Sequence, residues 1–459
     1  MSLSVAGTTM PGGLAYMAAS LRRAGHDPEI LDGYLASENE MIARLRSRKH
    51  EMLAISCVCA TAGAAAQLAQ RARRELGEGL FIVAGGQGPS GMEKKFFELA
   101  PAVDAVVVGE GEEAICEIAN RLDRPQTIAQ VPGVLHQRNG EVIVGPPPRL
   151  IADLDSLPFP ALDLLNIADY VPSASHYRRL PVATVTSSRG CPNSCMFCFK
   201  ISGNTIRMRS PENVVAEILL AHERHGAREI IFWDENFTHD RGRVLDICER
   251  LRAAGNPVVW WCAGRVDGVD LELLQAMQSA GCWQILFGVE SGSNRILNLI
   301  GKSTNTDLIR GAFALARRAG IKTYATFILG HPTETVDEAM QSIDFALELD
   351  PNIAEFFPAT PFYGTELARR AAAFGEVNGG PENLGMHLAP FVPATMTRSQ
   401  LMELRRRAHR TFYMRPAYVL KYLRGIRTWV EVADMFKGAA TLLRDQLPSR
   451  GERPKRPGD

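Results

Sequence analysis

The chain has 459 residues, is 46% hydrophobic and 22% charged, and balances 51 basic against 51 acidic residues. Its length exceeds what one hydrophobic core normally holds and its composition is that of a globular protein, so we expect more than one domain. Zero net charge indicates no large polyanionic partner; the basic run at 405–410 is better explained as a solvated helix face, and nucleic-acid binding is a minor alternative.

The first 130 residues alternate short apolar runs with amphipathic segments such as 14–24. We expect strands near 29–31, 53–56, 81–84 and 105–108. This alternation predicts a doubly wound, flavodoxin-like α/β domain over residues 1–130.

Small residues dominate the loops that follow these predicted strands, which would let a large flat ligand approach the backbone. Tight turns also need glycine, so any one loop is weak evidence. The candidate binding residues are Ser56, Thr61, Gly85, Gly86, Gln87, Gly109 and Glu110.

Residues 131–180 have the pattern of a connector. A hairpin turned at Asn139-Gly140 precedes two Pro-rich segments, 144–149 and 153–160. Pro-rich chain is extended and stiff, so this linker can hold two domains face to face.

Three cysteines, Cys191, Cys195 and Cys198, lie within eight residues. Four ligands close a structural zinc site and four thiolates close an electron-transfer [4Fe-4S] cluster, so a compact set of three suggests a cluster with one iron left open for chemistry. Three ordinary buried cysteines in a strand-to-helix turn are the alternative.

The cysteines follow the first of six apolar runs, each of which precedes a segment with helical periodicity. Continuous apolar strands that alternate with helices predict a parallel sheet, and six such units predict a partial (β/α)6 barrel over residues 181–365. The expected strands are 182–187, 229–233, 258–262, 285–289, 323–329 and 353–357.

Polar clusters follow four of these strands, at 234–238, 264–267, 290–293 and 330–333. The carboxyl ends of parallel strands meet at one rim of a barrel, where active sites lie. A carboxylate or hydroxyl after a strand is also often only the N-cap of the next helix, which is an open alternative for Asp234 and Ser293.

The cysteine spacing and these clusters together resemble the radical S-adenosylmethionine (SAM) enzymes, whose CxxxCxxC motif has an aromatic residue before the last cysteine. The resemblance implies that Cys191, Cys195 and Cys198 bind a [4Fe-4S] cluster whose open iron binds SAM. It also implies a role in SAM or substrate binding for the residues that match the other motifs: Glu290, Ser291 and Arg265 at the ribose or methionine moiety, Asp234 and Glu235 near the amine or the substrate, and Phe197 with Gly330 to Pro332 beside the adenine.

The run 12–27 and the loops that follow it resemble the cobalamin-binding domain of B12-dependent radical SAM enzymes, which are related to anaerobic Mg-protoporphyrin monomethyl ester cyclases and hopanoid-modifying enzymes. Cobalamin is therefore an expected cofactor. The DxHxxG segment that supplies an axial imidazole is absent, which favours cobalamin without His ligation, and a clear first strand before residue 10 is also absent.

The resemblance implies an enzyme that generates a 5'-deoxyadenosyl radical and methylates an unactivated carbon of a small-molecule or natural-product substrate, with an electron donor such as flavodoxin or ferredoxin. Two alternatives stay open: oxidative cyclisation or ring rearrangement of a tetrapyrrole or lipid, and a non-catalytic Fe-S binding module.

Helical patterns at 397–413 and 417–447 predict a cap over residues 366–447, and the Arg-, Lys-, Pro- and Gly-rich residues 448–459 are expected to be disordered. The absence of a signal peptide and of a disulfide-like cysteine framework predicts a cytoplasmic protein. No segment has the pattern of a transmembrane helix, although peripheral membrane contact through the C-terminal part is an open possibility.

Overall fold

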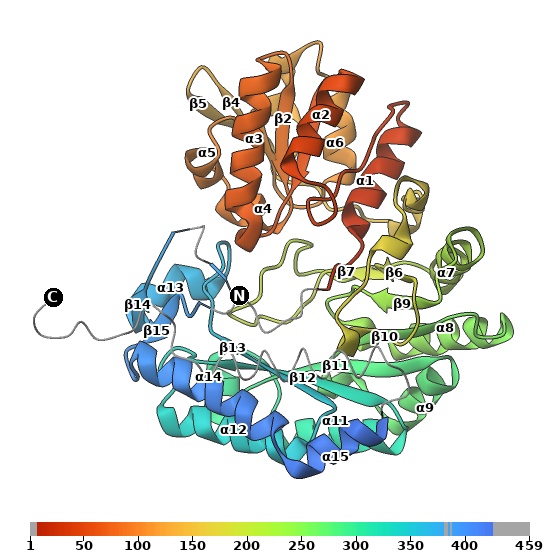
Figure 1. Cartoon of the computed structure of the whole chain (residues 1–459), viewed down its shortest axis with the longest axis vertical. Helices are drawn as coiled ribbons and strands as arrows, with labels where there is room; N and C mark the ends of the chain where they lie inside the picture. The colour runs from red at the N-terminus through yellow and green to blue at the C-terminus, as the bar shows by residue number, and fades with distance from the viewer. Residues whose placement is uncertain (1–6, 381–383, 386–387, 426–459) are drawn as a thin grey trace, which may run out of the picture.

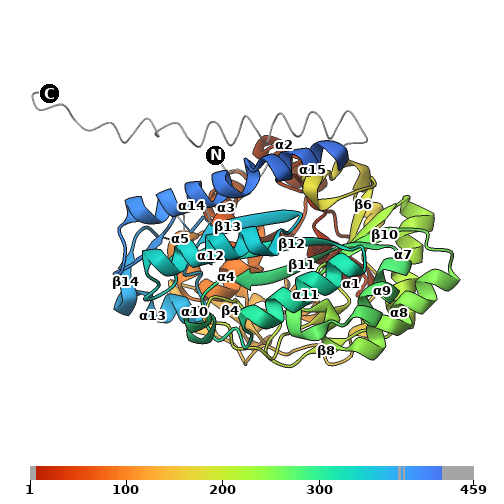
Figure 2. The same ribbon diagram turned by 90° about the horizontal axis from the view of Figure 1, so that it is seen from below.

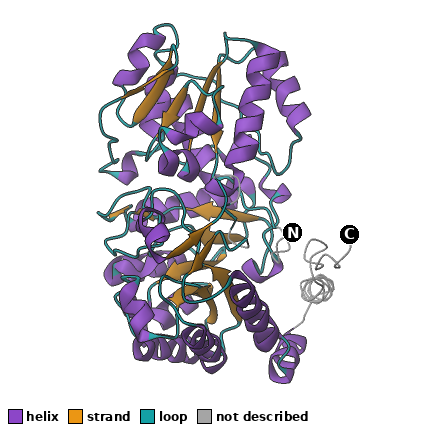
Figure 3. Cartoon of the chain, turned by 90° about the vertical axis from the view of Figure 1, so that its left-hand side faces the viewer, coloured by secondary structure: helices purple, strands orange, loops and turns teal. Residues whose placement is uncertain are grey.

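The computed structural model describes residues 7–380, 384–385 and 388–425. Two sheets organise these residues, and Figure 1 shows the N-terminal sheet with its helices stacked over the larger sheet. Figure 3 shows the same two layers from the side, each sheet with helices packed beside it. This arrangement confirms the α/β fold class.

The N-terminal sheet has five strands in the order β1-β2-β3-β4-β5, of which the first three are parallel. The hairpin turned at Asn139 and Gly140, both with positive φ, supplies β4 and β5 and so extends this sheet from within the predicted linker. The strands are β1 (Met52–Ser56), β2 (Phe81–Gly85), β3 (Ala105–Val107), β4 (Val134–Arg138) and β5 (Glu141–Val144).

Helices cover both faces of this sheet, because its central strands carry apolar side chains on each side. Ile82 and Val83, adjacent on β2, point into two different hydrophobic cores. The helices are α1 (Gly12–Arg23), α2 (Glu38–Arg48), α3 (Ala62–Leu76), α4 (Gln87–Met92), α5 (Lys95–Leu99) and α6 (Glu112–Ala119).

The strand expected at 29–31 is wrong: this segment is irregular. A strand exists only when a neighbour pairs with its backbone, and no described segment pairs with this one. Instead, the Glu29 carboxylate binds the side chains of Arg44 and His50.

The second sheet is a curved, open layer of six parallel strands in the order β13-β12-β11-β10-β9-β6, which confirms the predicted partial barrel. All six strands lie where the apolar runs placed them, with β11 longer than expected. They are β6 (Val182–Val185), β9 (Glu229–Phe232), β10 (Val259–Gly264), β11 (Cys282–Glu290), β12 (Lys322–Leu329) and β13 (Ile353–Pro358).

Helices cover the convex face of this sheet, as Figure 2 shows from below, and the largest hydrophobic core lies between them and the strands. Their N-termini are capped by side chains at the strand-end loops; Ser210, for example, accepts from the Asn213 N–H at the start of α7. The helices are α7 (Pro211–His225), α8 (Arg241–Ala253), α9 (Leu271–Ser279), α10 (Asn294–Leu299), α11 (Thr306–Arg318) and α12 (Val336–Leu349).

The opposite, concave face has its own apolar floor. Val182, Ile231, Trp261 and Trp283 form a separate cluster there, so Trp261 is a packing residue. Trp233 follows Ile231 by two residues and therefore points to the same side, but it is 61% exposed.

After β13 the chain is mostly helical, in α13 (Glu366–Phe374), α14 (Arg398–Tyr413) and α15 (Pro416–Gly425), with a small antiparallel pair, β14 (Gly375–Val377) and β15 (Phe391–Pro393). The expected helix at 417–447 is seen only as α15; its remainder and the tail at 448–459 lie outside the described residues. Within the described part of the chain, no helix is both long enough and apolar enough to span a bilayer.

Candidate functional site

The three cysteines lie in a loop whose ends are tied together by a two-stranded hairpin. Ser188–Arg189 (β7) pairs with Arg207–Met208 (β8), so residues 190–206 leave and return at one narrow neck. This loop follows β6 and therefore lies at the carboxyl end of the barrel sheet. All nine cysteines are free thiols, and these three are half-buried.

A loop after α10 packs on the cysteine loop. Gly301 has a φ of 68°, and a Cβ added there would lie 2.7 Å from the Ser194 carbonyl oxygen. The Gly301 carbonyl oxygen lies 3.7 Å from the Cys195 Sγ, and the Met196 N–H donates to the Ile300 carbonyl at 2.9 Å.

The thiols influence one another and face cations. Burial and the neighbouring thiols of Cys195 and Cys191 together raise the pKa of Cys198 to about 11, with burial the largest cause. Burial likewise raises the pKa of Cys195, while the positive charges of Lys302 and Arg265 act in the opposite direction. These cations offset negative charge that gathers at the thiols.

The donor set fits a multi-iron cluster better than a single ion. Among the described residues, no three His, Cys, Asp or Glu side chains converge closely enough to hold one metal ion. Thiolates that bind an iron–sulfur cluster each take a different iron, so they need not meet at one point. Three half-buried, unoxidised thiols on one loop satisfy that requirement.

Two of the predicted SAM-contacting residues lie beside this loop. Glu290 ends β11 with a φ of 66°, and its carboxylate accepts from Lys302 Nζ at 2.8 Å. Arg265 forms a two-point ion pair with Asp267 and donates to the Lys302 carbonyl oxygen at 3.1 Å.

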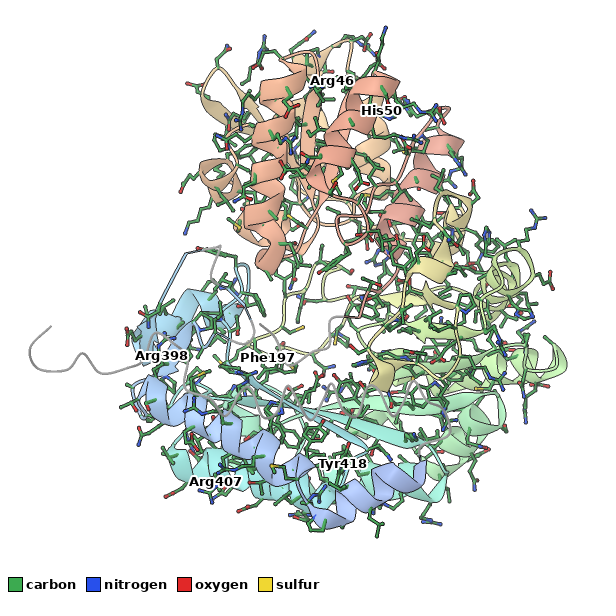
Figure 4. The ribbon with its side chains drawn as sticks, viewed as in Figure 1. Arg46, His50, Phe197, Arg398, Arg407 and Tyr418 are labelled. Carbon is green, nitrogen blue, oxygen red and sulfur yellow. The ribbon has the colours of Figure 1, made fainter. Side chains whose placement is uncertain are left out.

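Phe197 lies between the N-terminal part and the barrel strands, as Figure 4 shows. Its ring is 6.2 Å from the buried His331 ring and 6.0 Å from Lys302 Nζ. His331 stands between Gly330, which has a φ of 79°, and Pro332. Burial lowers the pKa of His331 to about 3, so this imidazole is neutral.

Two other predicted site residues, Asp234 and Ser291, are hydrogen-bonded within the protein. The Asp234 carboxylate accepts from the Ser187 N–H and from the hydroxyls of Ser187 and Ser188, at 2.6–2.7 Å. The Ser291 hydroxyl contacts the Ser342 hydroxyl of α12 at 3.2 Å. Glu235, next to Asp234, is exposed at the rim.

Helix α4, which follows β2, and the loop after β3 face the cysteine loop. A Cβ added at Gly91 would lie 2.4 Å from the Tyr363 carbonyl oxygen and 3.3 Å from the Phe199 ring, and one at Gly109 would lie 4.0 Å from the Ile201 carbonyl oxygen. Phe199 and Ile201 both belong to the cysteine loop.

These loops offer small residues to a ligand, but not all of the candidates are equally available. Ser56, at the end of β1, is exposed, whereas Thr61, Gly85, Gly86 and Gln87, at or just after strand ends, are half-buried. Glu110, in contrast, has only 4% of its side chain exposed and is paired with Arg207. The third loop therefore takes part in the contact between the two parts of the chain, through the pairing of Glu110 with Arg207.

Sequence reasoning missed Lys302, Arg189 and Arg207. None belongs to a recognisable motif. Arg189 and Arg207 acquire their roles through partners 77 and 97 residues away, and Lys302 through Glu290, which lies 12 residues before it on another element. The sequence shows that these residues are positively charged, but it does not show which carboxylates they bind.

Two family models match the chain: the radical SAM superfamily over residues 185–346 and the B12 binding domain over residues 1–119. An uncharacterized methyltransferase of Pyrococcus horikoshii, PH0819, is 32% identical over 91% of this chain and 91% of its own length. The anaerobic magnesium-protoporphyrin IX monomethyl ester cyclase of Cereibacter sphaeroides is 28% identical, over 90% of this chain and 68% of the cyclase.

The fold is also similar to solved structures. The cobalamin-dependent S-adenosylmethionine radical enzyme OxsB, solved with aqua-cobalamin and S-adenosylmethionine bound, superposes with a TM-score of 0.75 over 95% of this chain and 69% of OxsB, at 18% identity.

Proposed function

The chain belongs to the radical SAM superfamily, in the group that carries an N-terminal B12-binding domain, and from this premise we propose that it is a cobalamin-dependent radical SAM enzyme that methylates an unactivated carbon. One observation supports this most: a loop with three free thiols faces the small-residue loops of the N-terminal sheet. Its cofactors are a [4Fe-4S] cluster, SAM and cobalamin.

When bound, these cofactors supply a 5'-deoxyadenosyl radical for hydrogen abstraction and a methyl group for transfer. The chain supplies binding, orientation and exclusion of water. Cys191, Cys195 and Cys198 would hold the cluster, and the β7–β8 hairpin holds the ends of their loop together.

The charged residues beside the cysteines would receive the methionyl part of SAM. Lys302 and Arg265 place positive charge there, and Glu290 places a buried carboxylate next to Lys302. Phe197 and the Gly330–Pro332 backbone would border the adenine. Asp234 holds β7 in place, and Ser291 would act through its neighbours, because both are bonded within the protein.

The N-terminal domain would hold the corrinoid with its first two strand-end loops. Ser56, Thr61, Gly85, Gly86 and Gln87 are the contacts we propose, with Gly109 and Glu110 beside them. A small-molecule substrate would enter between the two sheets, where the exposed Trp233 offers an apolar surface. We also propose that a flavodoxin or ferredoxin donates the electrons. We propose a cytoplasmic location for the protein.

The test is anaerobic reconstitution with iron and sulfide, followed by incubation with SAM, a reductant and hydroxocobalamin. We expect 5'-deoxyadenosine by mass spectrometry and corrinoid retained after desalting. Cys195→Ala should abolish 5'-deoxyadenosine, whereas Cys116→Ala, at a half-buried thiol of α6, should not. Equal activity in both variants would refute the cluster assignment.

Oxidative cyclisation is the second candidate, because the similarity to the cyclase extends over most of this chain. Once a substrate is found, the product mass separates the two functions, since methylation adds one carbon and cyclisation adds none.

A further inference from the structure

Two arginines at the neck of the cysteine loop bind two glutamates of the N-terminal domain. Arg189 on β7 and Arg207 on β8 pair opposite each other in the hairpin. Arg207 binds Glu110 at two points, 2.9 and 2.6 Å, and Arg189 Nη2 lies 2.5 Å from Glu112. Arg189 also approaches Glu110, at 3.6 Å.

These four side chains are 4–12% exposed. The exposed pair of Arg241 and Asp270, in contrast, is 44% and 50% exposed. A buried, two-point arginine–carboxylate contact fixes both distance and orientation, because little water is present to replace either partner.

Arg207 joins three parts of the chain at once. Besides Glu110, it donates to the Ser202 carbonyl oxygen within the cysteine loop at 2.9 Å and to the Ile151 carbonyl oxygen in the linker at 2.6 Å. The Ile151 N–H donates back to Glu110 at 2.8 Å. The loop after β3 is therefore bonded directly to the neck of the loop that carries the thiols.

We propose that the pairs Glu110–Arg207 and Glu112–Arg189 couple the two cofactor sites, so that corrinoid binding to the N-terminal domain changes the affinity of the cluster site for SAM. The four residues are positioning residues, since none is placed on a reacting atom. This inference rests on the proposed function.

Coupling of this kind is reciprocal and measurable as a ratio of dissociation constants. We would measure SAM binding to the cluster-loaded protein by equilibrium dialysis, with and without saturating hydroxocobalamin, under anaerobic, non-turnover conditions. For the unmodified protein we expect the SAM dissociation constant to change about fivefold or more, which is the lower end of typical coupling.

Glu110→Gln keeps the shape of the side chain and removes the charge, and Glu112→Gln does the same at the second pair. We expect the ratio of the two SAM dissociation constants to fall towards one in both variants, while the iron content persists in both. Corrinoid binding should persist in Glu112→Gln, because Glu112 is not among the proposed corrinoid contacts. Tyr16→Phe is the control: Tyr16 of α1 bonds Glu217 of α7 at 2.7 Å and Arg209 at 3.0 Å, so it joins the same two domains through bonds other than the two glutamate–arginine pairs.

The inference is overturned if hydroxocobalamin does not change the SAM dissociation constant of the unmodified protein. It is also overturned if both glutamine variants keep the ratio of the unmodified protein, or if Tyr16→Phe lowers that ratio as much as they do. Each of these results leaves the proposed function standing, since both ligands bind. Failure of the unmodified protein to bind a cluster or corrinoid would instead refute the proposed function itself.

Discussion

Several carboxylates at the ends of the barrel strands are buried and hold chain segments in place. Asp234, after β9, has three donors from Ser187 and Ser188. Glu229, at the other end of the same strand, accepts from the backbone N–H groups of Arg178 and Arg179 and from the Trp283 ring nitrogen. These contacts fix the segments that lead into β6 and out towards the cysteines.

Asp234→Asn should destabilise the protein although it preserves the side-chain shape. The amide of asparagine would place its own N–H donors against the three donors that now bind the carboxylate. We therefore expect the free energy of unfolding to fall by about 2–3 kcal/mol, the typical penalty for a buried polar group left unsatisfied. Urea denaturation measures this loss. Asp163→Asn is the control: it breaks an exposed ion pair with Arg22 and should cost less than about 1 kcal/mol. Equal effects of the two substitutions would contradict the role assigned to Asp234.

Glu229 should make the stability of the protein depend on pH. Burial raises the pKa of Glu229 from 4.5 to about 7, against the opposing effect of its three donors. A carboxyl whose pKa is higher in the folded state stabilises fully below pH 4.5, and that contribution is lost as the pH rises towards 7. Relative to Glu229→Gln, the unmodified protein should therefore lose about 2 kcal/mol of unfolding free energy between pH 5 and pH 8. If the unfolding free energies of the unmodified protein and of Glu229→Gln change with pH in parallel, this role of Glu229 is refuted.

At the scale of elements, the β7–β8 hairpin turns a long loop into a closed site. The chain leaves β7 through Gly190, which has a φ of 90°, and a Cβ there would lie 2.3 Å from the Thr205 carbonyl oxygen. The two sides of the neck touch at this point, so the thiols depend on a residue without a side chain.

Gly190→Ala should therefore impair cluster incorporation as well as stability. Gly226, the C-cap of α7, separates the two effects: its φ is 72°, but an added Cβ there meets nothing within 4 Å. Both substitutions should lower the free energy of unfolding by about 1–2 kcal/mol, because alanine is disfavoured in the left-handed backbone conformation. Only Gly190→Ala should lower the iron content after reconstitution, as measured per folded protein. A normal iron content in Gly190→Ala would show that the neck tolerates widening.

The sequence predicted what depends on local pattern and missed what depends on distant partners. The barrel strands were visible because each is a continuous apolar run, and the cysteine motif lies within eight residues. The strand at 29–31 failed because an apolar run becomes a strand only beside another strand. The pairing of Arg207 with Glu110 spans 97 residues, and no periodicity reports such a separation.

At the scale of the whole molecule, the two domains meet through backbone as well as charge. Gly91 of α4 lies against Tyr363 of the barrel and Phe199 of the cysteine loop, and the close approach of these chains requires that residue 91 have no side chain. The linker meets both domains at a separate place: residues 146–150 are exposed, whereas Ile151 is buried and held by Glu110 and Arg207.

Gly91→Ala should loosen this contact and make the linker easier to cleave. The added Cβ would force the Tyr363 backbone away, at a cost of about 1–3 kcal/mol for overpacking. A protease needs an extended segment, so trypsin cleavage after the exposed Arg149 depends on how often the linker is released. Each 1.4 kcal/mol by which the substitution destabilises the contact should raise the cleavage rate roughly tenfold, provided that release of the linker is fast compared with cleavage. Gly79→Ala is the matched control in the same domain, because its Cβ would meet nothing within 4 Å. If both variants are cleaved at the rate of the unmodified protein, the contact at Gly91 does not hold the domains together. The other contacts between the domains, namely the charged pairs at the neck and the bonds of Tyr16 to Glu217 and Arg209, must then carry that role.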